Sequence, residues 1–355
     1  MALSKINPTN LSSWAKLDKN FKAECNNHIS SFFEESDRLE KFTISWRDFY
    51  LDFSKNRLSS SSFQLLVDLC GETDLKNNIE KYFNGSVINE TEKRAVLHTA
   101  LRSSEIKNPN LKKEINDTLD KILSISDELN SGKKLGYTGK KITDVVNIGI
   151  GGSHLGPEMV TEALSYYSHG VIPHFVSNID PDFTSKLLEK LNPETTVFII
   201  VSKTFTTIET LENAKKIRKW FIDKVNIESI KDHFIAVSNN TEAPKDFGIL
   251  PVNVLSIPEW VGGRFSLWGS VGLIISIVIG SKNFKEFLKG AESMDLHFRN
   301  SPFEKNIPVI LALISIWYNN FFKCETEAVL PYNQFLGKLP DYLQQASMEL
   351  SLIHI

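Results

Sequence analysis

The chain has 355 residues, of which 23% are charged and 41% are hydrophobic, and this composition excludes a disordered or collagen-like protein. Its length corresponds to about two domains. Forty Lys and Arg residues against 43 Asp and Glu residues give a formal net charge of −3, so the sequence offers no general basic surface for nucleic acid or for an anionic membrane. An anion bound by this protein must therefore be held by local groups.

The cysteines and the N-terminal sequence indicate the compartment. Cys25, Cys70 and Cys324 are widely spaced and form no Cys-x-x-Cys pair, which argues against a disulfide framework or a zinc site; we expect small core residues. The N-terminus lacks an apolar stretch followed by a small-residue cleavage site, so we predict a cytoplasmic protein. The most apolar windows, residues 271–279 and 307–317, are shorter than the ~20 residues that span a bilayer and are expected to be buried.

The first part of the chain, up to residue 130, is predicted to be mostly helical. Apolar residues recur at helical spacing over residues 14–42, and residues 91–101 and 112–129 have helical compositions. Residues 49–53 alternate between apolar and polar side chains, which predicts a strand.

From residue 143, short β-branched runs alternate with helix-like stretches. This βαβ pattern predicts a parallel sheet with helices on both faces. Ligands of such sheets bind at the carboxyl ends of the strands, so the loops that follow the strands are where a site is expected. The predicted strands lie within residues 144–150, 171–178, 195–202 and 233–238.

After residue 281 the sequence predicts a return to helix, then a strand-like stretch, then a last helix that ends near Met348. This order is typical of the start of a second α/β unit. We therefore predict a helical part at residues 1–110, a sheet domain at 111–280 and the beginning of a second sheet domain at 281–349. The predicted elements of the last part are helices at 283–294 and 308–322 and the strand-like stretch at 327–332.

The loop at residues 149–157, Gly-Ile-Gly-Gly-Ser-His-Leu-Gly-Pro, is the first candidate anion site. Its glycines allow backbone N–H groups to face a ligand, and the helix that follows adds partial positive charge, so phosphate is the expected ligand. A tight strand-to-helix turn without a ligand is the alternative. A dinucleotide is disfavoured, because His154 takes the place of the third glycine of Gly-x-Gly-x-x-Gly and because Asp180 lies beyond the next strand.

The loop at residues 202–210, Ser-Lys-Thr-Phe-Thr-Thr-Ile-Glu-Thr, is the second candidate. Its hydroxyls, its ammonium group and the free amides at a helix start match the oxygens and the charge of a phosphate monoester. A capping box formed by Thr206 and Glu209 would need no ligand, but it leaves Ser202, Lys203 and Thr204 unexplained.

Two further segments carry charged candidates. Arg264 follows two glycines and precedes an apolar stretch, which would let it face a ligand oxygen that becomes negative during a reaction; pairing with a core carboxylate is the alternative. Glu349 lies at the end of an amphipathic stretch, and this position by itself is typical of a solvated surface residue.

Four segments together resemble the glucose-6-phosphate isomerase family, in the family's order and with similar spacing. The first two are typical of sugar-isomerase (SIS) domains in general, whereas the last two are typical of this family. The segments are GIGGSHLGP (149–157), SKTFTTIET (202–210), GGRFSLWGSVGL (262–273) and PYNQFLGKLPDYLQQASME (331–349), with support from RAVLHTALR (94–102) and FKCETEAVLPY (322–332).

The resemblance implies a three-layer αβα SIS-type fold with a flavodoxin-like parallel sheet at residues 111–280, and a second, incomplete SIS-type domain. It implies reversible conversion of glucose 6-phosphate to fructose 6-phosphate through a cis-enediolate, in glycolysis and gluconeogenesis. Neither a metal nor an organic cofactor is expected, and the full-length form is expected to be a homodimer. The alternative is a SIS-type module that binds a sugar phosphate without turning it over.

The resemblance also implies a role for each matching residue. Glu349 would be the base that carries a proton between C1 and C2, and Arg264 the cation beside the cis-enediolate. A sugar-phosphate sensor would need neither of these two residues. The residues implied to bind phosphate are Ser153, Ser202, Lys203, Thr204 and Thr207, and those implied to shape the sugar pocket are Gly152, Gly263 and Gln345.

The resemblance ends at Glu349, after which the family continues with Ser-Asn-Gly-Lys and this chain reads Leu-Ser-Leu-Ile-His-Ile. We expect residues 350–355 to be a non-native tail, since they equal the translation of a sequencing adapter. A fragment of this kind would lack the family's ring-opening histidine, for which His354 is no substitute, and its C-terminal lysine. Little or no isomerase activity is therefore expected from these residues alone.

Overall fold

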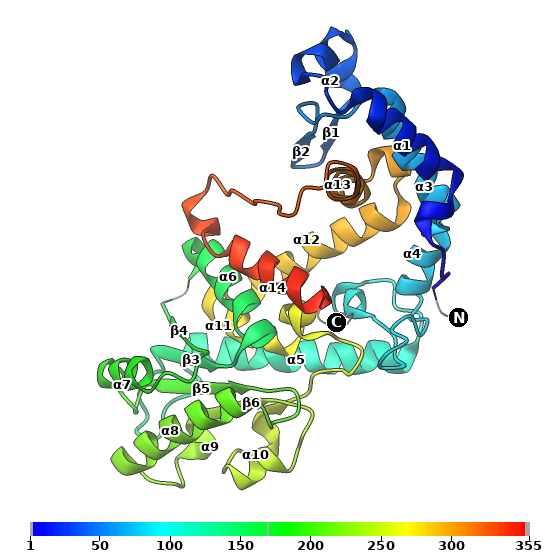
Figure 1. Ribbon diagram of the computed structural model, residues 1–355. Helices are drawn as coiled ribbons and strands as arrows, with labels where there is room; N and C mark the ends of the chain where they lie inside the picture. Colours follow the sequence, from blue (N-terminus) through cyan, green and yellow to red (C-terminus); the bar gives the residue numbers. More distant parts are fainter. Residues whose placement is uncertain (1–2, 169, 352–355) are drawn as a thin grey trace. The chain divides into compact units, whose positions relative to one another are not determined.

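The computed structural model describes residues 3–168 and 170–351 (Figure 1). The chain divides into two compact units: unit 1 comprises residues 1–96 and 291–328, and unit 2 comprises residues 97–290 and 329–355. The helix α12 (Ser281–Asn300) contributes residues to both units. The division assigns the segment 281–349 partly to each unit, and the predicted domain boundaries stay a prediction.

Unit 1 is built mainly from helices around an aromatic core. The apolar faces of α1 (Ser12–Glu24), α3 (Ser60–Glu72) and α13 (Ile307–Ile316) supply buried residues such as Leu17 and Leu66. The fully buried Trp317 begins a π-helical turn after α13 and packs against Phe21. The other elements are α2 (Arg38–Lys41), α4 (Leu75–Phe83) and the antiparallel hairpin β1 (Thr43–Trp46) and β2 (Phe49–Asp52), of which β2 confirms the predicted strand.

Two sequence predictions are wrong outside the sheet. Residues 91–101 do not form an α-helix, and only residues 98–101 are helical, as part of the 3-10 helix η3 (His98–Arg102). Asn89 pairs with Arg94 through both backbone bonds, its Oδ1 accepts from the Glu92 amide, and Lys93 has a φ of 52°, so side-chain capping favours a turn over a helix. The strand-like stretch 327–332 is irregular, since no described strand pairs with it.

Unit 2 contains a five-stranded parallel sheet in the order β4-β3-β5-β6-β7. The four predicted strands are confirmed, and the two-residue edge strand β7 was too short to detect from the sequence. The bounds are β3 (Asp144–Ile148), β4 (Ile172–Val176), β5 (Thr196–Val201), β6 (Phe234–Val237) and β7 (Val254–Leu255).

Helices cover both faces of this sheet, which confirms the αβα prediction (Figure 1). Val197 and Ile199 of β5 point to the face packed by α5 (Pro109–Ser131), α6 (Leu155–Ala163) and α11 (Leu273–Ile279). The alternate residues Phe198 and Ile200 point to the face packed by α7 (Pro181–Lys190), α8 (Ile208–Lys224) and α9 (Ile230–His233). Strands buried on both sides explain the continuous apolar runs in the sequence.

The strand order fixes where a ligand can bind. From β3 the chain moves outward to β4, then returns to the other side of β3 as β5 and continues outward to β6 and β7. The chain therefore leaves the neighbouring strands β3 and β5 in opposite directions along the sheet, toward β4 and toward β6. In open α/β sheets this switch point, at the carboxyl ends of the strands, forms a crevice for ligands.

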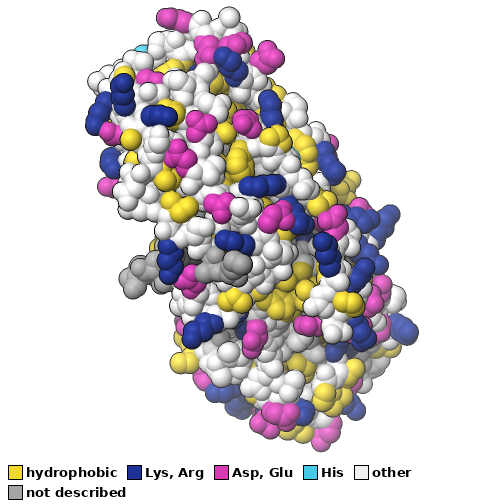
Figure 2. Space-filling view, turned by 90° about the vertical axis from the view of Figure 1, so that its right-hand side faces the viewer, with side chains coloured by type: hydrophobic (Ala, Val, Ile, Leu, Met, Phe, Trp, Pro, Cys, Tyr) yellow, Lys and Arg dark blue, Asp and Glu magenta, His cyan; other side chains and the backbone are white. Residues whose placement is uncertain are grey.

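Two predictions, on membrane-spanning segments and on surface charge, can be compared with the structure. In the described residues, no helix combines the length and the apolar character needed to cross a bilayer. Figure 2 shows positive and negative side chains intermixed over the face drawn, in keeping with the near-neutral composition.

Of the cysteines, only Cys70 is a buried core residue; Cys25 is half-buried and Cys324 is exposed, so the core prediction is wrong for those two.

Candidate active site

The glycine-rich loop after β3 is held by a residue inside the strand. Asn147 is 1% exposed, and its Nδ2 donates to the Ser153 carbonyl oxygen at 2.9 Å. Gly151 has a φ of 60°, a conformation that favours glycine, and the loop enters α6 at Leu155. The Ser153 hydroxyl is thus presented where the backbone turns from the sheet into the helix. Asn147 was not predicted from sequence, although a polar residue in a buried strand was the available signal.

The loop after β5 carries paired hydroxyls. Ser202 Oγ lies 3.1 Å from Thr207 Oγ1, and Thr204 Oγ1 lies 2.6 Å from Thr206 Oγ1. Thr207 is the N-cap residue of α8, and its side chain makes no capping bond. The capping box of Thr206 and Glu209 is therefore absent from this helix start, which removes the alternative explanation of the motif.

Phe205 lies between these hydroxyls in an unusual conformation. Its φ is 57°, a left-handed value that costs a non-glycine residue energy. The side chain is 5% exposed, and the Phe205 amide donates to the Ser202 carbonyl at 3.1 Å. Burial of the ring and the closed turn together compensate the unfavourable backbone.

Lys203 joins the second loop to the third segment. Its Nζ donates to the carbonyl oxygens of Glu259 and Val261, each at 3.2 Å. The sequence interpretation treated this lysine only as a counter-charge for phosphate. In the structure its ammonium also fixes the hydroxyl loop to the chain that leads into Gly262.

The first and third segments touch through glycine backbones. A Cβ atom at position 152 would lie 2.3 Å from both the carbonyl carbon and the carbonyl oxygen of Gly263. Such a distance is far inside van der Waals contact, so only glycine fits at position 152. This close approach brings the start of the segment η7 (Gly263–Trp268) against the glycine-rich loop.

Arg264 has no carboxylate partner among the described residues, contrary to the alternative of a core ion pair. Its guanidinium lies 4.9 Å from the centroid of the Phe265 ring. Behind that ring, His98 stacks on Phe265 with centroids 4.2 Å apart. Burial, with a further contribution from Arg102 and Arg264, lowers the pKa of His98 to about 3. His98 is therefore neutral near neutral pH, and its ring packs against Phe265.

The helix α14 (Leu339–Ser351) brings the acidic candidate to the same place. Gln345 and Glu349 lie one turn apart, and Gln345 Nε2 donates to Glu349 Oε2 at 2.5 Å. The other carboxylate oxygen lies against Gly263, because a Cβ there would be 3.3 Å from Glu349 Oε1. Glu349 is half-buried, so the interpretation as a solvated surface residue is wrong.

The sequence matches a known protein family. The sequence profile of the family described as phosphoglucose isomerase matches residues 52–351. The chain belongs to the phosphoglucose isomerase family. The resemblance seen in the four motifs is thereby confirmed.

Individual relatives of this family are similar over nearly the whole chain. A glucose-6-phosphate isomerase of Christiangramia forsetii is 50% identical over 353 residues, which cover 98% of this chain and 65% of that protein. The crystal structure of a glucose-6-phosphate isomerase from Chlamydia trachomatis matches with a TM-score of 0.87 at 27% identity, covering 97% of this chain and 66% of that one. The hypothetical protein TT0462 from Thermus thermophilus shares the fold, with a TM-score of 0.60 at 23% identity over 81% of this chain and 61% of its own. This chain thus spans less than two thirds of the length of these relatives.

In this phosphoglucose isomerase family member, all the predicted site residues belong to unit 2. The glycine-rich loop, η7 and α14 contact one another, and Lys203 ties the hydroxyl loop to the chain before η7. His354 lies outside the described residues. The residues brought to this edge of the sheet are Gly152, Ser153, Ser202, Lys203, Thr204, Thr207, Gly263, Arg264, Gln345 and Glu349.

A second group of residues supports the site and was missed from sequence. Tyr342 of α14 donates its hydroxyl to the Arg264 carbonyl at 3.0 Å, and burial raises the pKa of this tyrosine to about 12. Glu158 of α6 contacts His154 Nε2 at 3.2 Å and Lys338 Nζ at 3.7 Å, and the hydrogen bond from His154 holds the pKa of Glu158 below its usual value. These contacts join α14, α6 and both glycine-containing segments.

Proposed function

We propose that this protein interconverts glucose 6-phosphate and fructose 6-phosphate through a cis-enediolate. The observation that carries the proposal is the position of the Glu349 carboxylate against Gly263, next to Arg264, at the sheet edge where the two phosphate-type loops diverge. The names of the similar proteins from Christiangramia forsetii and Chlamydia trachomatis agree with it.

The two loops would hold the phosphate group. The hydroxyls of Ser202, Thr204 and Thr207, with Ser153 from the first loop, offer donors for the phosphate oxygens. The amides at the start of α8 and the Lys203 ammonium add positive charge near the same loop. Phosphate binding would then place the sugar toward α14.

Glu349 and Arg264 would carry out the proton transfer. A C–H bond beside a carbonyl is a very weak acid, so the reaction needs a base and stabilisation of the oxygen that becomes negative. Glu349 would take the proton from C2 of the open-chain aldose and return it to C1. The permanently charged Arg264, which no described carboxylate neutralises, would stabilise the enediolate oxygen.

The alternative is a module that binds the sugar phosphate without turnover. Such a module needs the hydroxyl loop but gains nothing from a half-buried carboxylate placed beside an arginine that has no carboxylate partner in the described part of the chain. The placement of Glu349 and Arg264 on contacting segments therefore supports an enzyme.

Solvent exchange tests the isomerase proposal directly. The protein is incubated in D2O with fructose 6-phosphate or glucose 6-phosphate, and deuterium at C1 and C2 is followed by NMR, while calorimetry measures binding. We expect binding and slow deuterium incorporation, in keeping with the low activity expected of these residues, and a long incubation reveals such turnover. Binding without exchange would favour the sugar-phosphate module, and the absence of both would overturn the proposal.

A tyrosine on α14 provides a finer test of the same site. Tyr342→Phe keeps the ring near Gly156 but removes the hydroxyl that donates to the Arg264 carbonyl. We expect the exchange rate to fall about tenfold, the effect of one lost buried hydrogen bond, with the phosphate affinity unchanged. Tyr332→Phe, at a fully exposed tyrosine, is the control. Equal losses in rate and affinity would show that Tyr342 has only a general structural role.

We also propose a cytoplasmic homodimer that works without a metal or an organic cofactor, with residues 111–280 as its small SIS domain. The family resemblance supports the homodimer, the lack of a cofactor and the domain assignment, and the spacing of the cysteines supports the cytoplasm. Light scattering of the purified protein tests the dimer.

A further inference from the structure

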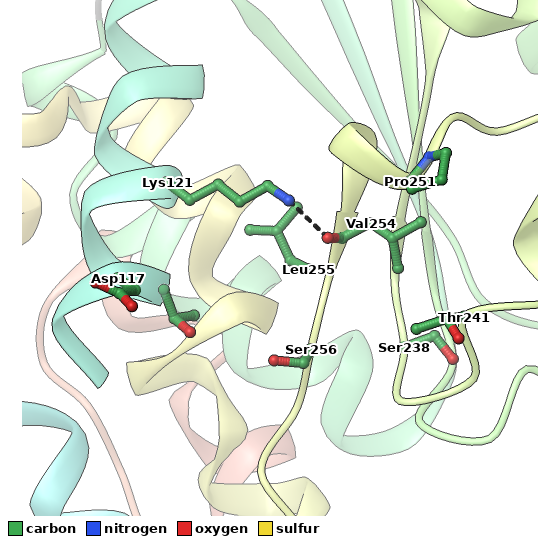
Figure 3. A pocket seen from close by; sticks show the side chains of 9 residues that line it. Asp117, Lys121, Ser238, Thr241, Pro251, Val254, Leu255 and Ser256 are labelled. Atoms are coloured by element: carbon green, nitrogen blue, oxygen red, sulfur yellow. Dashed lines mark hydrogen bonds between the residues drawn. The ribbon is translucent and has the colours of Figure 1, made fainter. Parts of the chain in front are cut away.

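A cavity of about 260 Å³ lies beside the hydroxyl loop, on the α5 side of the sheet (Figure 3). We call it the Lys121 pocket. Residues of α5, of the loop after β6 and of β7 surround it. They are Asp117, Thr118, Lys121, Ser238, Thr241, Pro251, Val254, Leu255 and Ser256.

We propose that the Lys121 pocket binds a small hydroxylated monocarboxylate, a ligand of the sugar-acid class. This site is separate from the proposed substrate site, since it contains none of the residues assigned to that site. The inference does not rest on the proposed isomerase activity.

The positive charge of Lys121 is the first observation behind the proposal. Its Nζ reaches across the cavity and donates to the Val254 carbonyl at 2.7 Å, as Figure 3 shows. An ammonium group has three donors, so two remain for a ligand. The lysine is half-buried, and this burial lowers its pKa because it removes part of the water around the ammonium group.

No carboxylate among the described residues balances this charge. Asp117 lies one turn away on α5, but its carboxylate pairs with Lys113 at 2.6 Å. Figure 3 shows Asp117 pointing away from the Lys121 ammonium. The pocket therefore has one unmatched positive charge, which fits one carboxylate; a phosphate dianion would leave a negative charge uncompensated.

The other walls fit the remaining parts of a sugar acid. Thr118 of α5 and Ser256, which follows β7, both line the pocket, and the described residues provide no bonding partner for their hydroxyls, so these are available to ligand hydroxyls. Pro251, Val254 and Leu255 add apolar surface against which a carbon chain can pack.

A ligand bound in this pocket would change the surroundings of the hydroxyl loop. Ser238 lines the pocket, and its Oγ donates to the Lys203 carbonyl at 3.2 Å. The neighbouring Asn239 amide donates to the same carbonyl at 2.9 Å. The Lys203 amide resonance is therefore a suitable reporter of occupancy.

Gluconate and sorbitol form a matched pair of probes, because they differ only at one end, where gluconate has a carboxylate and sorbitol has a CH2OH group. Calorimetry and amide NMR are performed on the protein with each probe. We expect gluconate to bind and to shift the amide resonances of Thr118, Ser256 and Lys203, whereas sorbitol binds at least tenfold more weakly. Saturation with glucose 6-phosphate should leave gluconate binding in place, because the two sites are separate.

Two variants identify the pocket as the place of binding. Lys121→Met should weaken gluconate binding about tenfold, as expected for the loss of a charged donor, while Lys112→Met, at an exposed lysine of the same helix, should not. The thermal midpoint of each variant confirms that it is folded. Absence of gluconate binding, equal binding by Lys121→Met and wild type, or full competition by glucose 6-phosphate would each overturn the proposal.

Discussion

Glu349→Gln is expected to lower the exchange of deuterium into hexose phosphate by a factor on the order of 10³, the usual contribution of a positioned general base. The amide has nearly the shape of the carboxylate, and its oxygen still accepts the bond that Gln345 Nε2 now donates to Glu349. It has no basic oxygen to receive the proton from C2. Substrate affinity should therefore change little while the exchange rate collapses.

NMR in D2O measures the exchange rate, and calorimetry measures the affinity. Asp341→Asn is the matched control, because this carboxylate lies on the same helix, is more than half exposed and makes only a 4.0 Å contact with Lys338. It should retain the wild-type rate. A Glu349→Gln variant with wild-type exchange would remove this residue from the mechanism and require a different base.

Gly152→Ala should damage both the binding site and the fold. The added methyl carbon would lie 2.3 Å from the Gly263 carbonyl group. This group belongs to the backbone, so it cannot rotate away as a side chain could. One of the two contacting segments must move, and Glu349 and Arg264 lie against or beside the same glycine. We expect a loss of about 1–3 kcal/mol in the free energy of unfolding, as for other overpacked sites, and at least tenfold weaker substrate binding.

Gly290→Ala is the control for this variant. Gly290 lies within α12, and a Cβ there meets no atom within 4 Å. Since alanine is the better helix former, this variant should be as stable as wild type or more stable by up to about 1 kcal/mol. Denaturant titrations give both values. Equal stability and binding for Gly152→Ala and wild type would contradict the close backbone approach.

The sheet was predictable because its strands are buried on both faces. Short, continuous runs rich in β-branched residues, such as residues 196–201, favour strands over helices when turn signals follow them. The loops that follow β3 and β5 could then be assigned to one edge from topology alone. The prediction failed at residues 91–101, where the Asn89 side chain and backbone favour a turn that helical composition does not reveal.

The supporting contacts of the site were less accessible to sequence reasoning. His98 stacks on Phe265, and Tyr342 bonds to Arg264, across separations of 167 and 78 residues along the chain. No local pattern encodes such pairs. Glu349 shows the same limit, since its amphipathic surroundings indicated a surface position and only the folded chain places it against Gly263.

The left-handed backbone of Phe205 has a consequence for ligand choice. A turn closed by a backbone bond and fixed by a buried ring has its shape in the absence of a ligand, so it would lose little conformational entropy on binding an anion. The same stiffness would limit how far the turn could adapt to anions of another size or geometry. On the proposed phosphate-binding role of this loop, the main chain would thus contribute to selectivity for a tetrahedral oxyanion, in addition to the hydroxyls that line it.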